Sequence, residues 1–306
     1  MRKIFGIGET VLDVIFKEGQ PQAAKAGGSV LNSVVSMGRM GLPVSFISEY
    51  GADDVGDIID SFLNKNGVNT SSVHRYEDGK TTLALAFLNE RNDAHYSFYK
   101  DYPSRRLNIE FPHLQQDDIL QFGSFYAIWP EIRTQIRKFV QESHNSGALV
   151  VYDPNFRKSH LDELSALKPL IIENMRMASL VRASDEDFRN IFRVNSPDEA
   201  WEIVKNYCNC LVYTASTEGV YVRTRSFSGK FPVKSIIPVS TIGAGDNFNA
   251  GMITSIYRNG IGRDQLAMTG QKEWTSIIET AVNFATHVCL SYENYISEEF
   301  ASQVYK

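Results

Sequence analysis

The chain has 306 residues, a length that allows two small domains or one large α/β domain with additions. Its 31 Lys and Arg residues against 36 Asp and Glu residues give a formal net charge of −5. No basic excess is available to bind a nucleic-acid backbone or an anionic membrane surface. The 43% hydrophobic and 22% charged residues are typical of a globular protein.

Cysteine content and the N-terminal residues indicate a reducing compartment. The three cysteines, Cys208, Cys210 and Cys289, are too few for a disulfide framework and have no second Cys or His pair nearby to form a zinc site. Residues 1–5 show neither the apolar core nor the cleavage site of a signal peptide. We therefore expect a cytoplasmic protein without nucleic-acid or membrane partners.

The first part of the chain alternates between predicted strands and helices. Residues 3–8 and 11–16 predict two strands, the first of which enters a glycine turn. Apolar residues at helical spacing predict a helix over 29–40, ending before Gly41, and a strand at 44–47 and a helix at 54–66 follow. This order predicts a mainly parallel sheet flanked by helices.

A hairpin interrupts the alternation. Residues 82–88 and 96–99 read as strands that flank a polar turn at 89–93. Together with the short strand at 11–16, this hairpin predicts a small sheet standing off the core as a lid over a cleft. We expect the lid strands at about 11–17 and 80–101.

The alternation resumes in the second part of the chain. Apolar periodicity predicts a helix over 132–147, and strands are expected at 148–152 and 180–182, with a helix over 185–192. Strands 211–214 and 220–223 are expected to pair, and long helices are expected at 246–258 and 274–290. Because no repeat or linker is evident, we expect a single α/β domain spanning residues 1–306 with a β lid.

Residues 241–248, Thr-Ile-Gly-Ala-Gly-Asp-Asn-Phe, carry the strongest chemical signal. A Gly-rich turn before a helix lets backbone N–H groups converge on an anion, and the helix N-terminus adds partial positive charge. An aspartate in the first turn, Asp246, can accept a proton from a substrate hydroxyl. The alternative is that Asp246 only caps the helix. These residues alone favour neither possibility.

The motif resembles the nucleotide-side signature of the ribokinase-like (PfkB) carbohydrate kinases. Residues 26–35, Ala-Gly-Gly-Ser-Val-Leu-Asn-Ser-Val-Val, are similar to the N-terminal signature of that family. Residues 153–157, Asp-Pro-Asn-Phe-Arg, resemble a stretch of fructokinases and 2-keto-3-deoxygluconate kinases. The resemblance covers nearly the whole chain in order and implies a ribokinase-like fold, a central mainly parallel sheet flanked by helices with a small β-sheet lid.

The resemblance also implies the site residues. Asp246 would be the catalytic base, beside an anion hole of Gly243, Ala244 and Gly245. The sugar would contact Asp13, Gly27, Gly28, Asn32, Phe98, Lys100 and Arg157. The nucleotide would contact Ser184, Thr214, Ser216, Gly219, Gly245 and Asn283, and Glu186 and Asp187 would serve Mg²⁺ through water. Structural alternatives stay open for several of these residues: a turn for Asp13, Gly27 and Gly28, a solvated position for Asn32, a surface ion pair for Arg157, core packing for Asn283, and a helix cap with an acidic first turn for Ser184, Glu186 and Asp187.

The function implied is transfer of the γ-phosphoryl group of ATP to a hydroxyl of a monosaccharide, a fructose-like ketose or a sugar acid. Two alternatives stay open, a non-enzymatic sugar-binding relative and a nucleoside kinase. Three departures from the family motivate the non-enzymatic alternative: Ser216 for a Gly, Asp187 for a Glu, and Ser240 for an Asp. In relatives this Asp helps hold a monovalent cation, so K⁺ use is in doubt. A homodimer through the lid strands is also expected from relatives.

Overall fold

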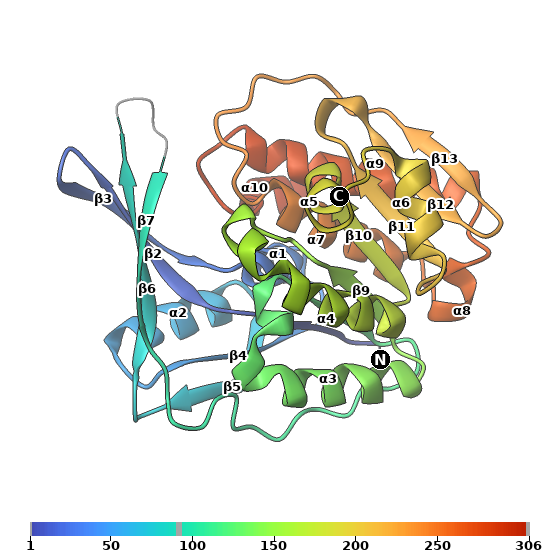
Figure 1. The fold of residues 1–306 in the computed structure, drawn as a ribbon. Helices are drawn as coiled ribbons and strands as arrows, with labels where there is room; N and C mark the ends of the chain where they lie inside the picture. Colours follow the sequence, from blue (N-terminus) through green and yellow to red (C-terminus); the bar gives the residue numbers. More distant parts are fainter. Residues whose placement is uncertain (1, 90–93, 304–306) are drawn as a thin grey trace.

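A nine-stranded sheet forms the centre of the protein in the computed structural model, which describes residues 2–89 and 94–303 (Figure 1). The strand order is β13-β12-β11-β10-β9-β8-β1-β4-β5. All neighbours from β5 to β11 are parallel, and β12 and β13 add an antiparallel edge. The strands are β1 (Ile4–Ile7), β4 (Val44–Gly51), β5 (Val68–Tyr76), β8 (Ile119–Gly123), β9 (Leu149–Asp153), β10 (Leu180–Ser184), β11 (Cys210–Thr214), β12 (Val220–Thr224) and β13 (Ser228–Phe231).

Helices cover both faces of this sheet because its strands are apolar on both faces. Ile4 packs into one hydrophobic core and its neighbour Phe5 into a second, as the alternation of strand side chains requires. The first core contains residues of α1 (Ser29–Arg39), α2 (Asp54–Lys65), α7 (Ala244–Arg258) and α9 (Gln271–Cys289). The second contains residues of α3 (Pro130–Asn145), α4 (Leu164–Met177), α5 (Asp185–Phe192) and α6 (Pro197–Val204). The predicted fold class is confirmed.

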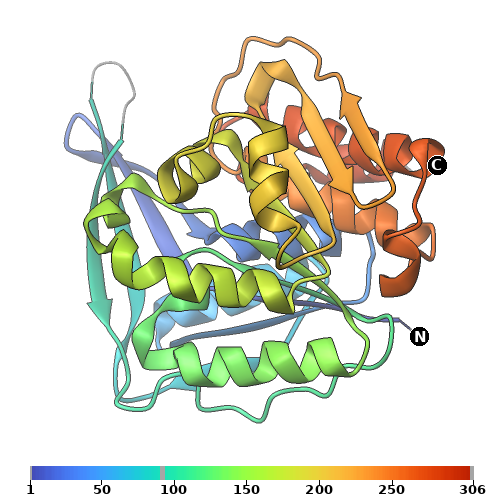
Figure 2. The same cartoon turned by 45° about the vertical axis from the view of Figure 1, so that its right-hand side comes forward.

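A second sheet, the lid, has the strand order β3-β2-β6-β7 and projects from the body in both views (Figures 1 and 2). Its strands are β2 (Val11–Lys17), β3 (Gln20–Gly27), β6 (Lys80–Leu88) and β7 (Ala94–Asp101). The expected hairpin is present as the antiparallel pair β6–β7, although residues 90–93 of its turn lie outside the described residues. Sequence reasoning missed β3, which pairs with β2 at the edge of the lid.

Short helices complete the chain. They are α8 (Arg263–Leu266), α10 (Glu298–Gln303) and the 3₁₀ turns η1 (Phe125–Ile128), η2 (Lys158–Glu163) and η3 (Ser216–Glu218). In the described part of the chain, no helix is both long enough and apolar enough to cross a membrane. The predicted helices and strands are present with ends shifted by a few residues, and β5, β8, β13, α4 and α6 were not predicted.

The parallel strands place their carboxyl ends at one edge of the sheet. Residues that follow or end β1, β8 and β9 therefore lie together, and the N-terminus of α7 meets them there. Residues that end or follow β8 and β9, together with residues of α7, line a small cavity there. Ligands of open α/β sheets bind at this edge.

Candidate active site

Helix α7 begins at a left-handed glycine. Gly243 has φ of 77°, a conformation that side chains rarely adopt, and a Cβ there would lie 2.8 Å from the carbonyl oxygen of Asn294. Ala244, Gly245 and Asp246 form the first turn, whose backbone N–H groups have no partner within the helix. Together with the helix dipole, these N–H groups suit an anion such as a phosphoryl group.

The carboxylate of Asp246 reaches across to helix α1. The Nδ2 of Asn32, a residue only 5% exposed, donates a hydrogen bond of 2.8 Å to Asp246 Oδ2. The residue at the cap position of α7 is Gly243, which has no side chain to cap the helix. This contact joins the two helices that carry the two family-like signatures, so it favours a role for Asp246 beyond capping.

Small polar side chains of α1 hold the backbone of α7 in place. Ser33 Oγ donates to the carbonyl oxygen of Asp246 at 2.6 Å, and Ser36 Oγ donates to Asn247 Oδ1 at 2.5 Å. Ser33 and Ser36 are fully buried, so these bonds form away from solvent. The separation between the predicted sugar side and the predicted phosphate side is therefore fixed by direct contacts.

Two carboxyl groups of the site have raised pKa values. Burial raises the pKa of Asp246 to about 6, with a further rise from the charge of Asp153, against the lowering effects of Asn32 and of nearby arginines. Burial also raises the pKa of Asp13 to about 6. Both groups are mostly ionised at neutral pH, as a base and a hydroxyl-binding carboxylate need to be.

These pKa values predict an acid limb in the pH profile of kcat/KM for the sugar. As the pH falls through about 6, Asp246 and Asp13 take up protons, so we expect a fall of more than about tenfold per pH unit. Asn32→Ala removes a bond that lowers the pKa of Asp246 and is expected to move the limb to higher pH. A profile that stays flat down to pH of about 4 would contradict both assignments.

The predicted sugar-binding residues around β2 and β3 pack against one another. A Cβ on Gly27 would lie 2.1 Å from Asp13 Oδ2, so only glycine lets this carboxylate lie against the strand. Gly28 has φ of 141°, and a Cβ there would lie 2.2 Å from the carbonyl oxygen of Glu9. The paired glycines therefore bring β1, β2 and the start of α1 into contact beside Asn32.

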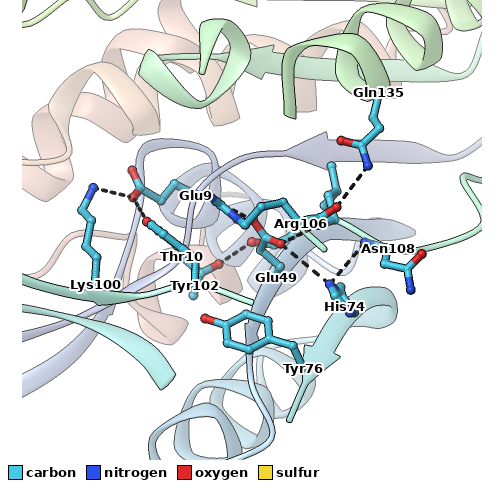
Figure 3. Close-up of polar contacts among 12 residues, drawn as sticks. Glu9, Thr10, Glu49, His74, Tyr76, Lys100, Tyr102, Arg106, Asn108 and Gln135 are labelled. Atoms are coloured by element: carbon cyan, nitrogen blue, oxygen red, sulfur yellow. Dashed lines mark hydrogen bonds and ion pairs between the residues drawn. The ribbon is translucent and has the colours of Figure 1, made fainter. Parts of the chain in front are cut away.

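The lid strand β7 contributes Phe98 and Lys100, of which Figure 3 labels Lys100. Lys100 Nζ lies 3.3 Å from Glu9 Oε1, which also accepts a hydrogen bond of 3.0 Å from the hydroxyl of Tyr102 (Figure 3). The same ammonium lies 4.6 Å from the ring centre of Trp129 and 5.3 Å from that of Phe98. Phe98 itself is 56% exposed. The positive charge of Lys100 is thus already neutralised by a carboxylate of the body.

A buried ion pair anchors the chain where it leaves the lid. Arg106 Nε donates to Glu49 Oε1 at 2.6 Å, and the backbone N–H of Leu107 donates to Glu49 Oε2 at 2.6 Å (Figure 3). The guanidinium also lies 3.6 Å from the ring centre of Tyr102. Because Tyr102 bonds Glu9, this pair fixes the segment that carries the Lys100 contact.

Arg157 lies on the body side of the cleft and is exposed. Its positive charge lowers the pKa of Asp246 and that of the lid residue Tyr96, while the charge of Asp13 raises the pKa of Tyr96. Arg157 and Asp13 therefore both lie near Tyr96. Of the predicted sugar-binding residues, Asp13, Gly27, Phe98 and Lys100 thus belong to the lid, and Asn32 and Arg157 belong to the body.

The predicted nucleotide-binding residues outside α7 come from the ends of β10 and β11, the turn after β11 and α9. Thr214 ends β11 and accepts a hydrogen bond of 2.9 Å from Arg182. Ser216 adopts φ of 44°, a conformation in which the usual glycine of the family is less strained. Gly219 leads into β12, and Asn283 is exposed on α9. None of these contacts shows what the residues bind.

The two predicted metal residues are engaged elsewhere. Asp187 is the third residue of the capping box of α5, whose N-cap is Ser184: its Oδ2 accepts hydrogen bonds from the N–H and the hydroxyl of Ser184, and its Oδ1 accepts one from the N–H of Phe156. Glu186 pairs with Lys158 at 3.1 Å. No cluster of three potential metal ligands occurs within residues 2–89 and 94–303. This geometry favours the capping alternative for Ser184 and Asp187.

Sequence reasoning missed Arg182, which lies directly beneath the glycine turn. A Cβ on Gly245 would lie 3.0 Å from Arg182 Nη1, and the same nitrogen donates to Asp153 Oδ2 at 2.8 Å. Asn249, on the next turn of α7, donates to the same oxygen at 2.7 Å. The available signal was a charged residue in the apolar strand β10.

A small cavity lies beside Asp246. Its volume is about 10 Å³, close to the minimum for one water molecule. Two buried acceptors among its lining residues, Gln121 Oε1 and Asn249 Oδ1, have no hydrogen-bond partner. The remaining lining residues include Ser29, Ser124, Asp153 and Asn155. The region next to the proposed base is therefore polar and nearly closed.

Comparison with known proteins identifies the class of enzyme. The sequence matches the pfkB family of carbohydrate kinases over residues 1–299, so the chain belongs to this family and is a phosphotransferase that acts on a sugar hydroxyl. It is 26% identical over 271 residues to a fructokinase of Escherichia coli, covering 87% of this chain and 88% of the relative. It is 25% identical over 271 residues to probable fructokinase-5 of Arabidopsis thaliana, covering 84% and 83%.

Solved structures show the same fold. Fructokinase with bound ATP from Xylella fastidiosa superposes with a TM-score of 0.84 at 20% identity, covering 99% of this chain and 98% of the other. Aminoimidazole riboside kinase from Salmonella enterica superposes with a TM-score of 0.84 at 19% identity, covering 99% and 98%. The predicted family, the kinase class and the ribokinase-like fold are confirmed.

Proposed function

We propose that the protein transfers the γ-phosphoryl group of ATP to a hydroxyl of a neutral, fructose-like ketose, with Asp246 as the base. The observation that carries this proposal is the Asn32–Asp246 hydrogen bond, which puts the carboxylate between the sugar-side and phosphate-side signatures. The curated fructokinase relatives and the fructokinase of known structure with bound ATP support the choice of ketose and nucleotide.

In the proposed reaction, Asp246 takes the proton of the acceptor hydroxyl as the oxygen attacks the γ-phosphorus, and the bond from the γ-phosphorus to the bridging oxygen breaks so that ADP leaves. The N–H groups at the start of α7 stabilise the charge on the phosphoryl oxygens. Asp13 and Asn32 orient the sugar hydroxyls, and the lid excludes water that would compete as a nucleophile.

The ion pair of Lys100 supports a neutral sugar over a sugar acid. Glu9 lies within 3.3 Å of the ammonium and would compete with a substrate carboxylate for it. A lysine also lacks the two-donor fork with which arginine binds a carboxylate. Among the predicted sugar-binding residues, Arg157 is then the one whose positive charge could bind the carboxylate of a sugar acid.

The hydrogen bonds of Asp187 and Ser240 bear on how the proposed reaction would use Mg²⁺ and potassium. Because Asp187 is occupied by hydrogen bonds, Mg²⁺ would be held chiefly by the ATP phosphates and by water. At position 240 the Ser Oγ accepts a hydrogen bond of 3.2 Å from the N–H of Ile242, and its N–H donates to the carbonyl oxygen of Cys289. We call residues 239–245 the phosphate loop, and we infer that these bonds hold it without potassium.

An acceptor panel tests the proposal. ADP release is measured with fructose, glucose, ribose, 2-keto-3-deoxygluconate and aminoimidazole riboside, each with and without potassium. We expect the highest kcat/KM for fructose and no potassium dependence. A preference for the sugar acid would show that Arg157 outweighs the Glu9–Lys100 pair, and a preference for the riboside would overturn the ketose assignment.

A further inference from the structure

A short segment after α9 touches three parts of the candidate active site. We call residues 289–296 the connector. Its Cys289 carbonyl oxygen accepts hydrogen bonds from the N–H groups of Val239 (2.8 Å) and Ser240 (3.3 Å), at the start of the phosphate loop. At its other end, Ile296 bonds α1: its N–H donates to Ser36 Oγ at 3.1 Å, and its carbonyl accepts from Arg39 at 2.7 Å.

The middle of the connector supports the glycine that starts α7. The carbonyl oxygen of Asn294 accepts a hydrogen bond of 2.7 Å from Asn247 Nδ2. The Cα of Asn294 would lie 3.2 Å from a Cβ on Gly243, so its backbone packs directly against that glycine. A displacement of Asn294 therefore changes the position of the N–H groups proposed to hold the phosphoryl group.

A lysine of the lid contacts the connector. Lys25 of β3 donates from Nζ to Glu293 Oε1 at 2.8 Å and to the carbonyl oxygen of Tyr292 at 3.0 Å. Its side chain is only 16% exposed, so the ammonium is held in this position by the two acceptors. The contact bridges 268 residues of sequence.

Lys25 also lies next to the sugar-binding residues. It is the direct cross-strand partner of Asp13, and Gly27 follows two residues later on the same strand. Cross-strand partners in antiparallel pairs have neighbouring side chains. Strand pairing thus links Asp13 to Lys25, an ion pair links Lys25 to Glu293, and the next residue, Asn294, packs against Gly243.

We propose that Lys25 is a positioning residue that couples sugar binding under the lid to the geometry of the phosphate loop. This inference rests on the proposed kinase function. The sugar that orders Asp13 and Gly27 would hold Lys25 on the connector, and the connector would hold Gly243 and Asn247 in the arrangement that binds the γ-phosphoryl group. Nucleotide would then bind more tightly when sugar is present.

The other lid lysine provides a contrast. Lys100 pairs with Glu9 (Figure 3) and lies against Trp129, and both partners are outside the connector. Loss of Lys100 is therefore expected to weaken sugar binding without breaking the path from the lid to Gly243. Loss of Lys25 is expected to break that path.

The experiment measures the affinity of a non-hydrolysable ATP analogue with Mg²⁺ by calorimetry, with and without saturating fructose. In the unmodified protein we expect fructose to tighten analogue binding by about fivefold or more. In Lys25→Met this ratio falls to about one, while the affinity for the analogue alone changes less than about twofold. Lys25→Arg keeps the ratio, and Glu293→Gln lowers it partly because Tyr292 still accepts a bond.

Controls separate coupling from loss of structure. Lys100→Met and Lys205→Met, which breaks an ion pair on α6, are expected to keep the ratio of the unmodified protein. A Lys25→Met protein with an unchanged ratio would overturn the inference, and so would the absence of coupling in the unmodified protein. Failure of the unmodified protein to bind fructose or the analogue would instead overturn the proposed function.

Discussion

Replacing Asp246 by Asn is expected to lower kcat by about 10²–10⁴-fold. The amide has the same shape as the carboxylate and its oxygen can still accept the hydrogen bond from Asn32, but it cannot take the proton of the acceptor hydroxyl. The backbone bond from Ser33 to residue 246 is also kept. The loss is therefore expected in the chemical step, and sugar affinity is expected to change little. Steady-state kinetics and calorimetry with fructose measure the two quantities.

Asp13→Asn is the matched control for that substitution. Asp13 has the same raised pKa but lies on the lid strand β2, where it would bind sugar hydroxyls rather than the transferred proton. We expect its replacement to raise KM for the sugar more than it lowers kcat. An Asp246→Asn enzyme that turns over at the normal rate would exclude Asp246 as the base.

Local sequence rules predicted the elements whose conformation is decided by a few neighbouring residues. Helix α7 is an example, because Gly243 can adopt the left-handed conformation before the helix and Asp246 then falls in its first turn. The hairpin β6–β7 is another, because two strand-like runs flank a polar turn. These two features predicted the hairpin of the lid and put Asp246 in the first turn of α7, whereas its assignment as the base came from the family resemblance.

Elements decided by distant partners could not be predicted in this way. Residues 20–27, Gln-Pro-Gln-Ala-Ala-Lys-Ala-Gly, show no apolar alternation, and β3 exists because it pairs with the edge of β2. Helix α4 contains Pro169, which argues against a helix from local rules, yet its apolar side chains pack into the second core.

The candidate site also combines residues that local rules can predict with residues whose places depend on distant partners. Ser184 and Asp187 are residue types that suit both a phosphate–metal environment and a capping box, and only the observed bonds distinguish the two. Arg182 acquires its place beneath Gly245 through Asp153, which lies 29 residues away in sequence on the neighbouring strand. Lys25 and its partner Glu293 in the connector are 268 residues apart in sequence, and no local motif marks their contact.

Replacing Arg182 by Met is expected to lower the free energy of unfolding by roughly 3–5 kcal/mol, because it leaves the carboxylate of Asp153 buried without its cationic partner. Both side chains are nearly buried, with exposed fractions of 10% and 8%. The positive charge of Arg182 also lowers the pKa of Asp246, so its loss is expected to move the acid limb of kcat/KM to higher pH. Urea unfolding and the pH profile measure the two effects.

The Arg182→Met, Asp153→Asn double variant separates stability from catalysis. Because it leaves no unpaired buried charge, we expect its unfolding free energy to exceed that of Arg182→Met. The shift of the acid limb is expected to be smaller than in Arg182→Met. Activity is not expected to be restored, since Gly245 still lacks the guanidinium beneath it. Arg189→Met breaks the exposed pair with Asp185 on α5 and is expected to change stability by less than about 1 kcal/mol. If Arg182→Met were as stable and as active as Arg189→Met, the buried pair would have no role in supporting the phosphate loop.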